Sequence, residues 1–242
     1  MFSTIWHTFF FDPVYNSLVF FIDVIPGGDV GLAIIATVLL VKTILLPISI
    51  KAVKTQKTMR EIEPKLKAIK EKFKNDKQQQ AQAMMSLYKE AGMNPLASIL
   101  LILLQIPIII ALYFSVSNGG GVPLPDINLD ILYAFISAPT EVTMNFLGSI
   151  DITAKSVWLA LGAGITQYLH VHYTMPTPPP KVEGSEPNMK EDFMRNMHTQ
   201  MKYVMPVIIT LVAYSISAAI ALYFLVSNLT TLAQEYFVRK HR

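Results

Sequence analysis

The chain has 242 residues, of which 52% are hydrophobic and only 15% are charged, and its mean hydropathy is +0.41. An ordinary soluble domain has about 25% charged residues, so this composition excludes that class and indicates an integral membrane protein. The formal net charge is +3, and the absence of cysteine excludes a disulfide framework, a thiolate nucleophile and a cysteine metal site.

Residues 1–29 have the pattern of an amphipathic helix that lies in the membrane interface. Val14, Leu18 and Ile22 recur at helical spacing, but polar residues interrupt the apolar run, so it is too broken to cross a bilayer. The sequence Pro26-Gly27-Gly28-Asp29 predicts a turn into the first span.

Residues 30–50 are the first predicted transmembrane helix, because about 20 helical residues cross the ~30 Å hydrocarbon core. Lys42 lies inside this run, and neither the run nor the apolar stretches 96–117, 157–173 and 203–234 contain an Asp or Glu that could pair with it. A lone cation at this depth costs at least ~2.5–3.5 kcal/mol, so we predict a hydrated cavity with Lys42 on its wall. The alternative is that the flexible side chain carries its ammonium group to the headgroup layer.

Residues 51–95 are predicted to form a helical hairpin in the cytoplasm. Lys51–Glu90 contains eleven basic and five acidic residues. Solvation of the helix surface and attraction to anionic lipid headgroups explain this excess of basic residues. Apolar residues recur there every three or four positions, as in a short coiled coil, and Pro64 predicts a bend or a new helix start. These apolar positions are Met59, Ile62, Leu66, Ile69 and Phe73.

The rest of the chain alternates between apolar and hydrophilic stretches. The further predicted transmembrane helices are residues 96–118, 156–173, 203–215 and 216–237, the last two meeting near Ser215–Ser217. The hydrophilic parts are an extracytoplasmic loop (119–155), a cytoplasmic loop (174–202) and a cytoplasmic tail (238–242). Residues 1–30 and 119–154 hold no Lys or Arg, whereas the hairpin, the second cytoplasmic loop and the tail hold eleven, four and three. The positive-inside rule therefore predicts five spans in the cell membrane, with the N-terminus outside and the C-terminus in the cytoplasm.

The sequence contains no motif of a catalytic or metal site. HExxH, GxSxG, the P-loop and GxGxxG are all absent, so we predict no enzyme, no cofactor and no metal. His170 and His172 are two positions apart and point to different helix faces, which makes a metal pair unfavourable and a core or interfacial role more plausible. Polar residues in the spans, such as Asn228, are interpreted as interhelical hydrogen bonds. Gln167 is instead predicted to line the cavity with Lys42.

The sequence resembles the YidC/Oxa-type membrane protein insertases in four segments: LLVKTILLPISI, MREIEPKLKAIKEKF, NPLASILLILLQIPIIIALYFSV and MPVIITLVAYSISAAIALYFLVSNLTTLAQEYF. The resemblance runs from about Asp12 to His241 and fits the short form of the family. It implies an all-α, polytopic bundle of five transmembrane helices with a hydrophilic groove, capped by a cytoplasmic helical hairpin. The family's functional basic groove residue, usually Arg, is matched by Lys42.

The resemblance implies that the chain moves hydrophobic segments of nascent membrane proteins from the cytoplasm into the bilayer, alone or with the Sec translocon. A face of methionines before the fourth span is predicted to receive clients, with packing against the bundle as the alternative. The predicted groove residues are Lys42, Val38, Gln167 and Tyr223, and the predicted client-receiving residues are Met194, Met197 and Met201.

The Sec translocon, the ribosome, the signal recognition particle and the lipid bilayer are candidate partners, and no nucleic-acid binding is expected. The basic tail that some family members use on ribosomes is reduced here to four residues, Arg239 to Arg242. Two other functions stay open. The first is a small channel or transporter that conducts an anionic solute past Lys42. The second is a scaffold that assists membrane protein assembly without inserting clients.

Overall fold

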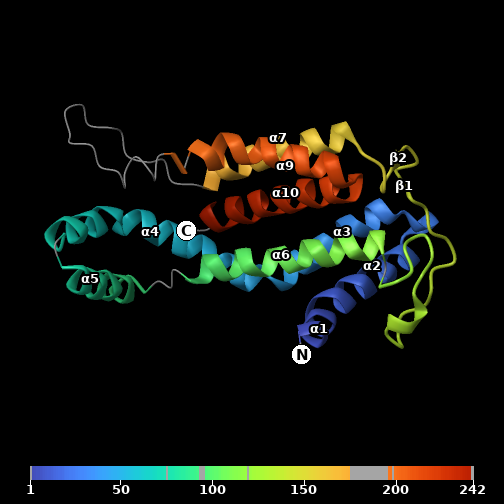
Figure 1. Cartoon of the computed structure of the whole chain (residues 1–242), viewed down its shortest axis with the longest axis horizontal. Coiled ribbons are helices and arrows are strands. Elements are labelled where there is room, and N and C mark those ends of the chain that lie inside the picture. The colour runs from blue at the N-terminus through green and yellow to red at the C-terminus, as the bar shows by residue number, and fades with distance from the viewer. Residues whose placement is uncertain are drawn as a thin grey trace. The chain divides into compact units, whose positions relative to one another are not determined.

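The computed structural model describes residues 2–74, 76–92, 96–118, 120–174, 196–197 and 199–240, and these are almost entirely helical (Figure 1). The α-helices are α1 (Phe2–Trp6), α2 (Asp12–Val24), α3 (Val30–Ile44), α4 (Leu46–Lys72), α5 (Lys77–Glu90), α6 (Leu96–Ser117), α7 (Val157–Thr174), α9 (Met205–Ile216) and α10 (Ala218–Lys240). Single π-helical turns, His7–Phe11 and Gln200–Val204, lead into α2 and α9, and the short strands β1 (Asn145–Phe146) and β2 (Ile150–Asp151) pair antiparallel. The chain forms two compact units, one of Met1–Thr43 with Pro107–Gln234 and one of Ile44–Ile106 with Glu235–Arg242.

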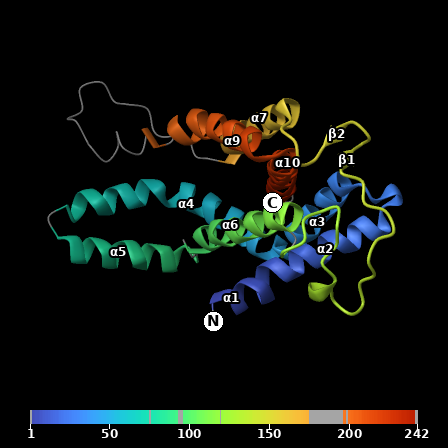
Figure 2. The same cartoon turned by 45° about the vertical axis from the view of Figure 1, so that its right-hand side comes forward.

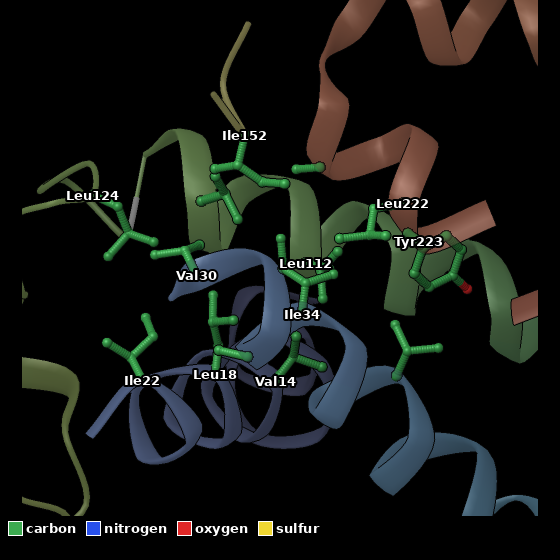
Figure 3. Close-up of a cluster of buried hydrophobic side chains, with 14 of the residues drawn as sticks. Val14, Leu18, Ile22, Val30, Ile34, Leu112, Leu124, Ile152, Leu222 and Tyr223 are labelled. Carbon is green, nitrogen blue, oxygen red and sulfur yellow. The ribbon is translucent and has the colours of Figure 1, made fainter. Parts of the chain in front are cut away.

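The largest apolar core of the first unit joins its N-terminal helices to α6 and α10 (Figure 3). Helix α2 contributes Val14, Leu18 and Ile22, whose helical spacing places them on one buried face, while Phe20 and Val24 on its other side stay exposed. The face of α2 that the sequence predicted to be apolar therefore packs in this core. Side chains from α3, the C-terminal part of α6, the 120–156 segment and α10 complete the core, among them Val30, Ile34, Leu112, Leu124, Ile152 and Leu222.

Two polar side chains of α2 attach the 120–156 segment to the bundle. Asn16, which is 1% exposed, donates to the Ile131 carbonyl (2.9 Å) and accepts from the Tyr133 backbone N–H (2.7 Å). The Tyr15 hydroxyl accepts a hydrogen bond from the Asn128 N–H (2.8 Å), and burial raises the pKa of Tyr15. Buried polar groups are stable only when paired in this way, so these bonds fix the position of the segment against α2.

The beginning of α3 is held by Asp29, which is 9% exposed and acts as the N-cap of the helix. One carboxylate oxygen accepts from the Leu32 N–H (3.0 Å), and the other accepts from the Leu147 N–H (2.8 Å) in the turn between β1 and β2. The Val30 N–H donates to the Thr143 carbonyl (3.1 Å). A single carboxylate thus caps α3 and ties it to a turn more than a hundred residues away.

The same segment also holds the beginning of α10. Helix α9 ends where Ser217 adopts an extended conformation (φ −168°), so the break falls within the predicted Ser215–Ser217. The first N–H groups of α10 have no partner inside the helix. Instead, Ala218 donates to the Ala154 carbonyl (2.7 Å) and Ala219 donates to the Ile152 carbonyl (2.9 Å). Because α7 starts at Val157, helices α3, α7 and α10 all begin at one end of this unit, which we call the anchored end (Figure 1).

Helices α7 and α9 lie side by side and pack through small residues (Figures 1 and 2). Ala160 and Ala163 of α7 are buried against Ala213 of α9. A Cβ atom added at Gly164 would collide with the Thr210 hydroxyl and would lie 3.2 Å from a backbone carbonyl of α9. Small residues let helix backbones approach closely, which is how helices associate in lipid, where apolar burial gives little drive.

Replacing Gly164 with Ala is expected to lower the melting temperature of the purified protein by roughly 2–8 °C, because overpacking outweighs the gain in helix propensity. Gly162→Ala is the matched control, since its added Cβ meets only the movable end of the Leu225 side chain. The measurement is thermal unfolding in detergent. Equal melting temperatures for the two variants would contradict tight packing at Gly164.

The second unit contains the helical hairpin of α4 and α5, which lie antiparallel (Figure 2). Ile62 and Leu66 of α4 are buried with Leu87 of α5, so the seam predicted from the sequence forms the contact between the helices. Asp76 caps α5 by accepting hydrogen bonds from the backbone N–H groups of the second and third helical residues (3.0 and 2.9 Å). Pro64 lies inside α4, which continues through it, so no new helix starts there.

The predicted first span, residues 30–50, is divided in the structure between α3 and α4. Pro47 lies in the first turn of α4, where its missing N–H is tolerated, and it cannot donate to the carbonyl four residues earlier. Within the part of the chain that is described, no single helix is long and apolar enough to cross a bilayer. Val30–Ile44 and Leu46–Met59 reach that length and hydropathy only as a bent pair. The five spans stay a prediction.

Candidate functional site

Lys42 lies in the last turn of α3 and is half-buried. Its ammonium group donates a hydrogen bond to the Thr231 hydroxyl of α10 (Nζ to Oγ1, 3.1 Å). Thr231 in turn donates to the Ser227 carbonyl one turn earlier (2.8 Å), so its hydroxyl is oriented to accept from Lys42. Among the described residues, Lys42 forms no ion pair with Asp or Glu within 4 Å. A neutral hydroxyl therefore holds this cation, and its charge is not neutralised by that contact.

Three polar residues lie at one level of the bundle. Lys42 is 12 residues from the start of α3, and Thr231 and His170 are each 13 residues from the starts of α10 and α7. At ~1.5 Å per residue, all three lie about 18–20 Å from the anchored end. The Nδ1 atom of His170 is buried and has no hydrogen-bond partner within the described part of the chain.

The other predicted groove residues lie closer to the anchored end. Val38 and Tyr223 are each 2% exposed and belong to the apolar core (Figure 3 labels Tyr223). The Tyr223 hydroxyl is buried without a hydrogen bond of standard geometry to any described residue. Gln167 is half-buried on α7, one turn before His170. The structure thus brings Lys42 together with Thr231, while Val38 and Tyr223 pack in the core.

A second polar contact joins α7 and α10 nearer the anchored end. The Asn228 side chain donates to the Thr166 hydroxyl (3.4 Å) and to the Ala163 carbonyl (3.5 Å), both long for hydrogen bonds. These contacts confirm the interpretation of Asn228 as a residue that joins helices.

The predicted client-receiving methionines are only partly described. Met194 lies outside the described residues, whereas Met197 is 46% exposed and Met201 is half-buried in the π-helical turn before α9. Tyr203, in the same turn, packs near Tyr168 of α7 (ring centroids 6.1 Å apart). The client-receiving face therefore stays a prediction.

Sequence reasoning did not select Thr231 and assigned His170 a core or interfacial role. Both residues become candidates only when the starts of their helices are known, because their distances from those starts match that of Lys42. A signal was present for Thr231, since it follows Ser227 by four residues and so lies on the same helix face.

The site can attract and hydrogen-bond an anionic group. It offers an ammonium group and an imidazole between apolar helices, where the effective dielectric constant is lower than in water and charges interact more strongly. Carboxylates are the biological side chains that such a set of groups recognises.

The chain matches the 60Kd inner membrane protein family over residues 21–242. It is 32% identical over 215 residues to the membrane protein insertase YidC of Clostridium tetani, covering 89% of this chain and 84% of that relative. Identity to the same-named protein of Oceanobacillus iheyensis is 31% over 240 residues, covering 98% and 84%. Identity to the membrane protein insertase YidC of Streptomyces avermitilis is 28% over 227 residues, and the match covers 88% of this chain and 51% of that longer relative.

Proposed function

The chain belongs to the 60Kd inner membrane protein family, the YidC/Oxa family, and on this premise we propose that it is an insertase of the cell membrane whose clients are nascent membrane proteins. Its relatives carry the name of membrane protein insertase and match this chain over most of its length. The apolar composition of the chain fits the same location.

The observation that carries the mechanism is the half-buried ammonium of Lys42, held by the neutral Thr231 hydroxyl. A client that enters the membrane must move a short polar segment, often with carboxylates, across the apolar layer. Lys42 attracts that segment, and a hydrated groove around it shortens the apolar path. The hydrophobic segment of the client then leaves sideways into lipid, driven by burial of its apolar surface.

We place the five spans on α3 with the start of α4, on α6, on α7, on α9 and on α10. Support comes from large apolar side chains that the first unit leaves uncovered, as expected for helices that face lipid. Examples are Trp158 (80% exposed), Ile165 (61%), Leu211 (59%) and Val207 (57%). The anchored end then lies outside the cell, and the hairpin and C-terminus lie in the cytoplasm. The Sec translocon, the ribosome and the signal recognition particle are proposed partners.

Purified protein in liposomes tests this function directly. We expect insertion of a small, Sec-independent client without leakage of anionic solutes. Selective anion flux without client insertion would instead assign the chain as a channel or transporter. If the protein shows no insertion and no flux but improves the folding of clients that the Sec translocon inserts, it is an assembly scaffold.

Water is expected to reach Lys42 from the cytoplasmic side only, because we propose that the 120–156 segment, which is hydrogen-bonded to α2, α3 and α10, covers the anchored end. In this cysteine-free chain, Lys42→Cys should react with a membrane-impermeant thiol reagent added from the cytoplasmic side and not from outside. Val38→Cys is the matched control, since Val38 is 2% exposed and should stay unreactive from both sides. Equal labelling of Lys42→Cys from both sides would contradict a groove closed to the outside.

A further inference from the structure

We propose that His170 is a second recognition residue of the insertase, whose Nδ1–H donates a hydrogen bond to the client carboxylate that Lys42 attracts. The inference rests on the proposed function and adds to it a preference among clients. His170 favours the insertion of clients that carry Asp or Glu in the segment to be translocated.

The first support is the level at which His170 lies. Lys42, Thr231 and His170 come from three different helices, yet all lie 12 or 13 residues from helix starts that share the anchored end. The Asn228 side chain of α10 contacts the Thr166 hydroxyl of α7, and Thr231 and His170 lie one turn further along these same helix faces. A carboxylate drawn to Lys42 therefore comes within reach of His170.

The second support is the unpaired Nδ1 atom of His170. A buried polar atom without a hydrogen bond costs roughly 1–3 kcal/mol, and no described residue pairs with this one. Thr231 is already engaged, because it accepts from Lys42 and donates to the Ser227 carbonyl. With its proton on Nδ1, His170 is thus a second donor at this level, beside Lys42, and a carboxylate that accepts from it pairs the buried atom.

His172 provides a matched comparison on the same helix. It is exposed, and its ring stacks on Tyr168 (centroids 5.8 Å apart, 10° between the planes). Its replacement by Phe removes an imidazole two residues from His170 while keeping an aromatic ring for the stack. At position 170, Asn keeps a polar atom close to the place of Nδ1, whereas Phe keeps only the ring.

The experiment compares two forms of one small client, which differ only in having Asp or Ala in the translocated segment, in liposomes with the full chain. His170→Phe is expected to slow insertion of the Asp client about tenfold more than insertion of the Ala client, as loss of a hydrogen bond to a charged group does. His170→Asn should restore most of the lost preference, and His172→Phe should leave the preference as in the wild type.

Equal slowing of both clients by His170→Phe, or no slowing of either, would overturn the role of His170 while leaving the insertase assignment intact. The role of His170 is also overturned if His172→Phe, and not His170→Phe, slows the Asp client more than the Ala client. Failure of the wild-type protein to insert either client would overturn the proposed function and this inference with it. Insertion of the Ala client by the His170 variants also reports that they are folded.

Discussion

Replacing Lys42 with Glu is expected to slow insertion of a client with acidic residues in its translocated segment by about a hundredfold or more. At an effective dielectric constant of ~20, two unit charges ~4 Å apart interact by about 4 kcal/mol, so losing an attraction and adding a repulsion removes several kcal/mol. Lys42→Ala removes only the attraction and should have a smaller effect of the same direction. Lys42→Arg keeps the charge and a donor for Thr231, so it should retain most of the rate.

The measurement is the rate of insertion in liposomes, with a form of the client whose acidic residues are replaced by Ala as the control. The control client should respond to Lys42→Glu far less than the acidic client does. Wild-type insertion of the acidic client by Lys42→Glu would end the electrostatic part of the mechanism.

Replacing Asp29 with Ala is expected to lower the free energy of unfolding by about 2–4 kcal/mol. The variant loses the N-cap of α3, which contributes ~0.5–2 kcal/mol, and it leaves the Leu147 N–H unpaired at a cost of ~1–3 kcal/mol. Asp29→Asn keeps one oxygen acceptor, so its free energy of unfolding should lie between those of the wild type and Asp29→Ala. Asp23→Ala is the matched control, because Asp23 is an exposed carboxylate six residues earlier.

Thermal unfolding in detergent gives the loss of stability, and hydrogen exchange at the Leu32 and Leu147 amides shows where it arises. Both amides should exchange faster in Asp29→Ala than in Asp23→Ala. If the two variants lose equal stability and exchange alike, Asp29 does not act as the tie between α3 and the β1–β2 turn.

Local features of the sequence predicted much of the helical structure. The break between α9 and α10 lies at Ser217, within the predicted stretch, and the seam of the hairpin includes Ile62 and Leu66 as expected. Both follow from periodicity and polarity over short windows. The sequence did not reveal the division at Leu45, because the apolar run is continuous there and hides the effect of Pro47. At Pro64 the sequence left a bend and a new helix start open, and α4 continues through this residue.

The anchored end could not be predicted, since its hydrogen bonds join residues far apart in the sequence. Asn16 binds the backbone at Ile131 and Tyr133, and Asp29 binds that of Leu147. No period or motif marks such pairs. The same limit applies to the candidate site: Lys42 stood out as an isolated charge, whereas the matching positions of Thr231 and His170 depend on where three helices begin.

The ties at the anchored end have a geometric consequence for Lys42. Helices α3 and α10 are each tied by hydrogen bonds near their first residues, so a tilt of either helix is expected to turn about that point, and the helix then acts as a lever. At about 18–20 Å from the pivot, a tilt of ~10° moves a residue by roughly 3 Å, whereas the core side chains of the first turn hardly move. Rigidity at one end thus converts a small angular change into a gap about one side chain wide at the level of the positive charge.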